Sequence, residues 1–214
     1  MAGHYGARWL RTLIYVNDRF DVRLPSFGLS HSPGMDMDDG FIAKPLGKRQ
    51  IDQAFPVVHA ILPDLGVERW RAFAAAVLDR AQVADEARVP RTGIMTVQNE
   101  RGYIHGLFSY ATEENLHHGK ILSVDNFIVH DLFNLSGAAA VLLHAMDGIA
   151  RGLGCSAIHT NLPPAYSSSA NDGNPVLNCF REGGHALETL RLCKPLDGAN
   201  DNHSRPLPTA HDGK

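Results

Sequence analysis

The chain has 214 residues, of which 44% are hydrophobic and 20% charged, as expected for one globular domain with a proper core. Its net charge of -3 argues against a nucleic-acid-binding protein, because such proteins usually carry a basic surplus. No apolar run approaches the roughly 18 residues of a membrane helix, no signal-peptide pattern opens the chain, and its three cysteines, Cys155, Cys179 and Cys193, form no C-x-x-C pair. We therefore expect a cytoplasmic protein whose partners are small molecules or other proteins.

The two ends of the chain differ in composition from its middle. Residues 1–40 end in Pro33-Gly-Met-Asp-Met-Asp-Asp-Gly40, which is typical of a flexible extension, although a short edge strand at 11–16 is an alternative. Residues 197–214 are rich in Asp, Asn, His and Pro, so a disordered tail is expected there. The folded domain is then predicted to occupy residues 41–196.

In the first half of this domain, apolar residues recur with strand and helix periods. Asn99-Glu-Arg-Gly102 suits a tight hairpin between two antiparallel strands. The segment from Thr112 to Gly119 is polar and predicts a connection rather than buried structure. The expected elements are a strand at 41–46, helices at 50–62 and 67–84, and strands at 93–97 and 103–110.

The second half of the domain centres on a strand that enters a turn of small residues before a helix. The strand covers 120–129, and the helix covers 136–152 with Ser136 as its expected N-cap. A strand at 155–161, a long loop at 162–173, a helix at 175–181 and a closing strand at 186–194 follow. Small residues at a helix start make a nest of free backbone N–H groups, and such a nest can hold a phosphate or pyrophosphate. An ordinary helix start in another α/β fold is the competing interpretation.

The order β-αα-ββ-β-α-β-α-β, with Asn134-Leu-Ser-Gly137-Ala-Ala139 at the start of the central helix, resembles the GNAT acyl-CoA N-acyltransferase superfamily. In that family an Arg or Gln, two residues, Gly, one residue and Gly or Ala bind the CoA pyrophosphate. Val129-His130 also resembles the Val-x-Pro that often precedes this motif. The resemblance covers about residues 41–196.

The resemblance implies a mixed α/β (α+β) fold, with a mostly antiparallel sheet splayed between its fourth and fifth strands and helices on both faces. It implies acetyl-CoA as the acyl donor, with the pantetheine arm along the fourth strand and the pyrophosphate on the turn. Dimers are common in the family, which leaves a homodimer open. The implied cofactor-binding residues are Phe127, Ile128, Val129, Asn134, Leu135, Ser136, Gly137, Ala138 and Ala139.

The implied reaction is transfer of an acyl group, acetyl as the expected one, to a small-molecule or protein amine by direct attack in a ternary complex. Family members often place a carboxylate on the fourth strand to receive the amine proton, and Asp125 is the acidic residue available there. A structural hydrogen-bond acceptor is its alternative role. Backbone N–H groups around Val129 would polarise the thioester carbonyl.

The sequence departs from the family in two places. Asn134 stands where Arg or Gln is usual, and no Lys or Arg lies between Lys120 and Arg151. Phe180 stands where the family has the Tyr that acts as general acid. Other candidates for that acid are Tyr166, Ser167, Cys179 or water. A catalytically silent module that binds an acyl-CoA or a protein partner is therefore the alternative function.

The chain contains twelve histidines, but their spacing does not predict a metal site. His117 and His118 are adjacent, and no H-E-x-x-H or similar motif accompanies them. We expect these two side chains to lie at the mouth of the substrate cleft or to be solvated. No metal is expected.

Overall fold

Five strands form one mixed sheet in the computed structural model, which describes residues 40–82, 89–167 and 174–188. The strands follow each other in the order β1-β2-β3-β4-β5, so neighbours in the sequence are neighbours in the sheet. The first three pairs are antiparallel, and β5 is parallel to β4. The strands are β1 (Ile42–Pro45), β2 (Thr92–Gln98), β3 (Ile104–Asn115), β4 (Gly119–Val129) and β5 (Ala157–Asn161).

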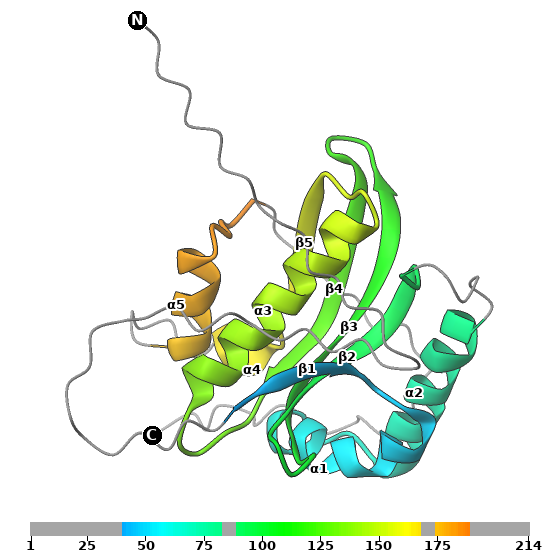
Figure 1. Ribbon diagram of the computed structural model, residues 1–214, viewed down its shortest axis with the longest axis vertical. Helices are drawn as coiled ribbons and strands as arrows, with labels where there is room; N and C mark the ends of the chain where they lie inside the picture. Colours follow the sequence, from blue (N-terminus) through cyan, green and yellow to red (C-terminus); the bar gives the residue numbers. More distant parts are fainter. Residues whose placement is uncertain (1–39, 83–88, 168–173, 189–214) are drawn as a thin grey trace, which may run out of the picture.

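Helices cover both faces of this sheet (Figure 1). Helices α1 (Ile51–Ile61) and α2 (Val67–Gln82) pack on one face, and a short 3-10 helix, η1 (Lys48–Gln50), leads into α1. Helices α3 (Leu135–Gly152) and α5 (Pro175–Glu182) lie on the other face, and α4 (Pro164–Ser167) is a single turn after β5. The predicted fold class, a mixed α/β fold with helices on both faces, is confirmed.

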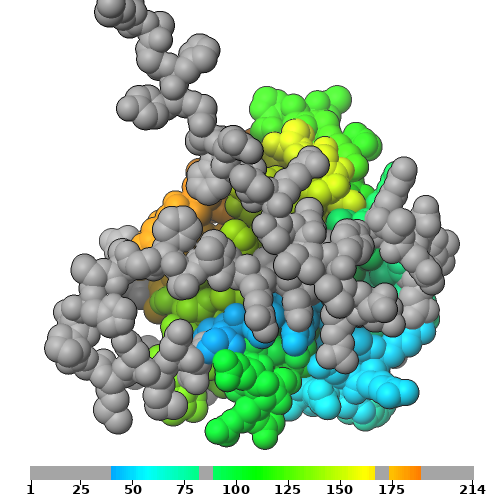
Figure 2. Space-filling view, viewed as in Figure 1, coloured from blue at the N-terminus to red at the C-terminus, as the bar shows by residue number. Residues whose placement is uncertain are grey.

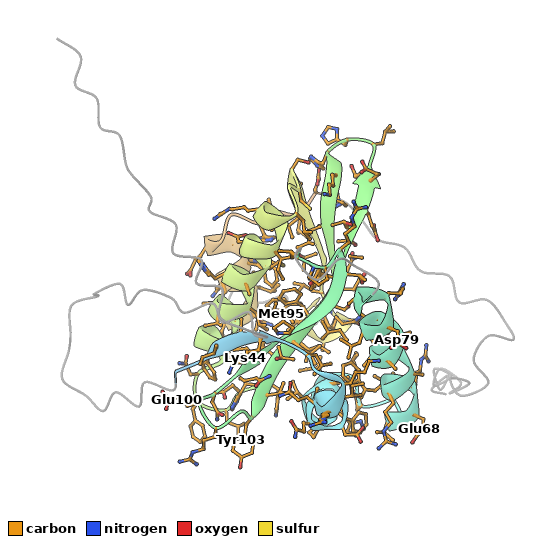
Figure 3. All side chains as sticks on the ribbon, turned by 45° about the vertical axis from the view of Figure 1, so that its right-hand side comes forward. Lys44, Glu68, Asp79, Met95, Glu100 and Tyr103 are labelled. Atoms are coloured by element: carbon orange, nitrogen blue, oxygen red, sulfur yellow. The ribbon has the colours of Figure 1, made fainter. Side chains whose placement is uncertain are left out.

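The sheet separates two apolar cores, because alternate side chains of each strand point to opposite faces. The larger core, which contains Met95 (Figure 3), lies under α3 and α5, and the smaller one lies under α1 and α2. Full burial of one large apolar side chain stabilises the fold by about 1.5–3 kcal/mol. The largest fully buried side chains are Phe108, Phe127, Ile94, Leu107, Leu122, Ile128, Leu142 and Met146.

Polar contacts join α1 to α2 outside the smaller core. The indole Nε1 of Trp70 donates a 2.7 Å hydrogen bond to the carbonyl of Ile51, and the Arg71 guanidinium pairs with Asp52 at 2.7 Å. Glu68 and Asp79 project from the outer side of α2 (Figure 3). The opposite side of α2 carries the buried residues Trp70, Ala74, Val77 and Leu78.

Most predicted elements are present, but three details are wrong. Residues 112–115 do not form a connection, because β3 continues to Asn115 and pairs Glu114 with Lys120 of β4; polar side chains are tolerated there since this end of the hairpin is exposed. The N-cap of α3 is Asn134 rather than Ser136. The expected closing strand does not begin at 186–188, and residues 189–194 lie outside the described part, as do 1–39 and 197–214.

Candidate active site

A β-bulge in β4 changes which side chains face each core. Asn126 has a backbone φ of 55°, and the register with β3 shifts between Leu107 and Ser109, so β4 has one extra residue there. Asn tolerates this left-handed conformation better than most residues. The side chain of Asn126 donates a 3.0 Å hydrogen bond to the Ser109 hydroxyl. In a regular strand the side chains of Asn126 and Asp125 would point to opposite faces. Here Asn126 instead bonds Ser109, the residue of β3 that is paired with Asp125.

The bulge reverses the alternation for the last residues of β4. Val124 contacts the core under α3, and so do Phe127 and Val129, whereas Ile128 packs under α1 and α2. In an uninterrupted strand, Val124 and Phe127 would face opposite sides. The bulge thus separates Asp125 from the segment 127–129, where the resemblance expects the pantetheine arm.

Strands β4 and β5 are paired only as far as Asp125 and Asn161, where β5 ends. From there β4 continues to Val129 without a β5 partner, and we call this unpaired stretch, where the resemblance expects the two strands to splay, the gap. At its entrance the Asn161 amide donates a 2.9 Å hydrogen bond to Oδ1 of Asp125. Asp125 is half-buried, so its carboxylate is both oriented and accessible.

Tyr166 of α4 lies at the end of β4, on the side that β5 has left. Its hydroxyl accepts a 2.9 Å hydrogen bond from the N–H of Val129 and lies 3.2 Å from the carbonyl oxygen of the same residue. The side chain is 6% exposed, and burial raises the pKa of this phenol. Tyr166 therefore remains protonated at neutral pH. Its hydroxyl accepts the hydrogen bond of the Val129 N–H, the group that the resemblance expects to polarise the thioester carbonyl.

The remaining candidate acids, and Phe180 at the family position of this acid, are placed less favourably than Tyr166. Phe180, at the family position of the general acid, is buried with its ring 4.8 Å from that of Phe127, and it has no hydroxyl. The Cys179 thiol lies 3.7 Å from the carbonyl oxygen of Ser136, and burial together with Glu182 raises its pKa. The side chain of Ser167 lies outside the described part. Among these described groups, Tyr166 is the one whose polar atom is hydrogen-bonded to β4.

The turn before α3 is organised by two side chains of the chain itself. Oδ1 of Asn134 accepts the N–H of Gly137 at 2.9 Å, and Oδ1 of Asp131 accepts the N–H groups of Phe133 and Asn134. A Cβ at Gly137 would lie 2.5 Å from the Asn134 amide, so the cap requires glycine. The expected nest therefore begins with one of its donors already bonded.

Two backbone donors of this turn are open. The N–H groups of Leu135 and Ser136 have no hydrogen-bond partner among the residues that the structure describes, whereas the N–H of Ala138 donates to the carbonyl of Asn134. Ala138 and Ala139 are fully buried against the sheet. An anion at the N-terminus of α3 would thus meet the first turn rather than the alanines.

Asp131 adds an acidic group next to this turn. Its second carboxylate oxygen lies 2.7 Å from Nδ1 of His105. Burial pushes the pKa of Asp131 upward, but the backbone N–H groups of Asn134 and Phe133 and the neighbouring His105 hold it below its ordinary value. The carboxylate is therefore ionised at neutral pH, close to where the resemblance places a pyrophosphate.

His117 and His118 lie in the turn between β3 and β4, at the end of the sheet away from Val129. They therefore do not lie beside the gap, and the exposed side chain of His117 agrees with the alternative expectation that these residues are solvated. An apolar cavity of about 290 Å³ lies elsewhere too, between β2 and α2, and its lining includes Leu78, Met95 and Tyr110. It contains no carboxylate, so it is not the site considered for acyl transfer.

No helix in the described ranges is long and apolar enough to cross a membrane.

Comparison with solved structures identifies the fold. An aminoglycoside N-acetyltransferase in complex with CoA superposes with a TM-score of 0.55 at 12% identity, over 72% of this chain and 94% of its own. Glucosamine-6-phosphate N-acetyltransferase from Arabidopsis thaliana gives 0.53 at 12% identity, over 73% and 99%. Ribosomal-protein-alanine N-acetyltransferase from Brucella melitensis gives 0.52 at 13% identity, over 73% and 100%.

No protein-family model matches the sequence, and no curated protein matches it either. The structural neighbours named above are all N-acetyltransferases. The chain thus has the fold of the GNAT acyl-CoA N-acyltransferases, as its order of elements and its central strand-turn-helix predict.

Proposed function

We propose that the protein is an N-acyltransferase that moves an acyl group, with acetyl as the expected one, from acyl-CoA to an amine. The observation that carries this proposal is the Tyr166 hydroxyl on the backbone of Val129, in the gap beyond the last β4–β5 pair. The N–H of Val129 already bonds an oxygen there. A thioester carbonyl oxygen is an acceptor of the same kind. The N–H of Val129 could therefore bond the carbonyl oxygen of the acyl-CoA that the fold implies.

The turn before α3 supports the same ligand. The N–H groups of Leu135 and Ser136 lie at the N-terminus of an 18-residue helix, where the partial positive charge favours an anion. Each charge-assisted hydrogen bond to a pyrophosphate contributes about 1.5–3 kcal/mol. These two residues would hold the pyrophosphate, and residues 127–129 would bond the pantetheine arm.

The amine must lose a proton to attack, since an ammonium has no lone pair. An amine with a pKa of about 10.4 is neutral in roughly one molecule in 2,500 at pH 7, a handicap of about 4.6 kcal/mol. Asp125, held by Asn161, would take this proton directly or through a water. Acetyl-CoA, when bound, supplies an acyl group whose carbon–sulfur bond breaks as the carbon–nitrogen bond forms.

Tyr166 would serve as the general acid. Its raised pKa keeps the hydroxyl protonated, so it can give a proton to the departing sulfur. For the N–H of Val129 to meet the thioester carbonyl, the hydroxyl must first leave that donor. We expect a short movement of α4, after which Tyr166 lies beside the reacting atoms.

A silent acyl-CoA-binding or protein-interaction module is the second candidate function. Asp131 near the turn, the Gly137 N–H already bonded by Asn134, and Phe180 in place of a tyrosine favour it. A silent acyl-CoA-binding module would use the same gap and turn, whereas a protein-interaction module would not need them. The enzyme differs from either module in that a proton acceptor and a donor act on an amine, which a transfer assay measures.

The test is a thiol-release assay with acetyl-CoA and a panel of small-molecule and peptide amines. For the enzyme, we expect transfer that falls about 100-fold in kcat in each of Asp125→Asn and Tyr166→Phe, because each variant removes one proton-transfer group. Tyr103→Phe, which changes an exposed tyrosine, should keep full activity. Thiol release that is absent, or that survives both site variants unchanged, would contradict the mechanism.

A further inference from the structure

Three histidines and a glutamate from three separate segments meet at the end of the sheet opposite the gap. His117 and His118 lie in the β3–β4 turn, His159 lies in β5, and Glu188 follows α5. This turn and β5 lie side by side at the top of the molecule (Figures 1 and 2). The 11 residues of β4 span roughly 33 Å between this turn and Val129, while His159 is paired with Ser123, two residues before the Asp125–Asn161 pair.

The donor atoms of the cluster are close enough to share one ion. One ligand atom from each of His117, His118 and Glu188 lies within 4.8 Å of the others. Nε2 of His118 is 2.7 Å from Oε1 of Glu188, and Nε2 of His159 is 3.8 Å from its Oε2. Tetrahedral zinc, with bonds of about 2.0–2.1 Å, needs ligand atoms about 3.3 Å apart. The two histidines approach different oxygens of Glu188, at 2.7 and 3.8 Å, so shifts of under about 1 Å would give the spacing that an ion needs.

His159 gives a second, independent observation. Its Nε2 is buried and has no hydrogen-bond partner among the described residues, although a buried polar atom is normally bonded. The nitrogen is within 4 Å of Glu188 and its ring is 5.3 Å from that of His118. A metal ion between these groups would satisfy the unbonded nitrogen.

Hydrogen bonds from neighbouring side chains fix the backbone of the two adjacent histidines before any ion binds. Oδ1 of Asn115 accepts the N–H groups of His117 and His118, at 2.9 and 3.0 Å, and so fixes the turn. The Ser156 hydroxyl bonds the carbonyl oxygens of His118 and Lys120, which ties the start of β5 to the same turn. Little reorganisation is needed, because these contacts order the ligands in advance.

We propose that His117, His118, His159 and Glu188 form a site for a divalent transition metal that fastens the β3–β4 turn and β5 to the segment after α5. Three imidazoles and one carboxylate are the donor set of Zn²⁺ and its neighbours Co²⁺, Ni²⁺ and Cu²⁺, whereas Mg²⁺ and Ca²⁺ prefer oxygen ligands. We assign the site a structural role, because its ligands come from segments that the ion would join, and it stands independently of the proposed function.

The test uses the full chain without an affinity tag, freed of metal by a chelator and titrated with Zn²⁺ alone in a calorimeter. We expect one Zn²⁺ ion to bind tightly to each chain, with an affinity that excess Mg²⁺ does not change. Glu188→Gln and His159→Asn should each weaken it at least tenfold. His144→Asn, at an exposed position on α3, is the matched control and should change nothing.

A Co²⁺ titration separates this site from binding by other histidines. A four-coordinate Co²⁺ site gives an intense visible absorption band, which we expect in the original chain and in His144→Asn but not in His159→Asn. Circular dichroism checks that each variant is folded. If His159→Asn does not fold, Glu188→Gln still tests the site, because Glu188 is exposed. Zn²⁺ binding that is absent, or that is equal in all variants, would overturn the proposal.

Discussion

At the scale of single residues, Tyr166 carries the most information about function. It comes from a loop with no strong periodicity, and its hydroxyl forms hydrogen bonds with the last residue of β4. The sequence made it one candidate among several, because nothing in the order of residues shows that a single helical turn brings it back to Val129. Phe180, at the expected position of the acid, instead packs in the core.

Tyr110 makes a prediction about stability at high pH. It is 7% exposed, and burial raises its pKa to about 12. Because the unfolded phenol ionises near pH 10, the stability contributed by the neutral buried form is complete below that pH and is lost as the pH rises toward 12. The two-unit difference corresponds to about 3 kcal/mol.

We therefore expect Tyr110→Phe to lose about 2 kcal/mol less free energy of unfolding than the original chain between pH 9 and pH 12, since the full difference is reached only above pH 12. Urea titrations at the two pH values measure this difference. Tyr103→Phe, at a 65% exposed position, is the control and should follow the original chain. If Tyr110→Phe and the original chain lose stability in parallel, the buried phenol is not the cause.

At the scale of elements, two residues at the start of α3, Asn134 and Ser136, are candidates for its N-cap. Asn134 accepts the N–H of Gly137, whereas the sequence favoured Ser136 as the cap. We expect Asn134→Ala to lower the free energy of unfolding by about 1 kcal/mol. Ser136→Ala should change it by less than about 0.5 kcal/mol. Thermal or urea unfolding measures both, and the reverse order would show that the serine is the cap.

The elements themselves are largely predictable from sequence, because strand and helix periods fix which side chains can be buried. The order from β1 to α5 follows from those periods, except for the single turn α4, which lies in a segment predicted as a loop. The bulge at Asn126 does not, since its one extra residue is visible only against the register of β3. The polar end of the β3–β4 hairpin is also hidden, because cross-strand pairing overrides a composition typical of loops.

The site residues show the same division. The sequence could place Asp125 on the fourth strand and the small residues at the start of α3, because both follow from local pattern. It could not place Asn161 against Asp125, or His159 beside His118, since these contacts depend on how β5 pairs with β4. Contacts between distant segments require the assembled sheet.

At the scale of the whole molecule, the two ends of β4 have different roles in this account. One end, past the last pair with β5, faces Tyr166 and the turn before α3. The other end carries the histidine cluster. Substitution of Glu188, which lies after α5, should leave the Tyr166 end intact, so acyl-CoA binding and metal binding are separable by mutation.

The central claim is that acyl-CoA binds across the gap and the first turn of α3, and calorimetry of the full chain with acetyl-CoA tests it most directly. Ser136→Glu puts an exposed carboxylate among the open N–H groups, where it suits the helix but repels a pyrophosphate. Ala140→Glu adds the same charge one turn further along, at another exposed position. We predict micromolar binding that Ser136→Glu weakens at least tenfold and Ala140→Glu leaves unchanged. No binding, or equal binding by all three proteins, would contradict the account.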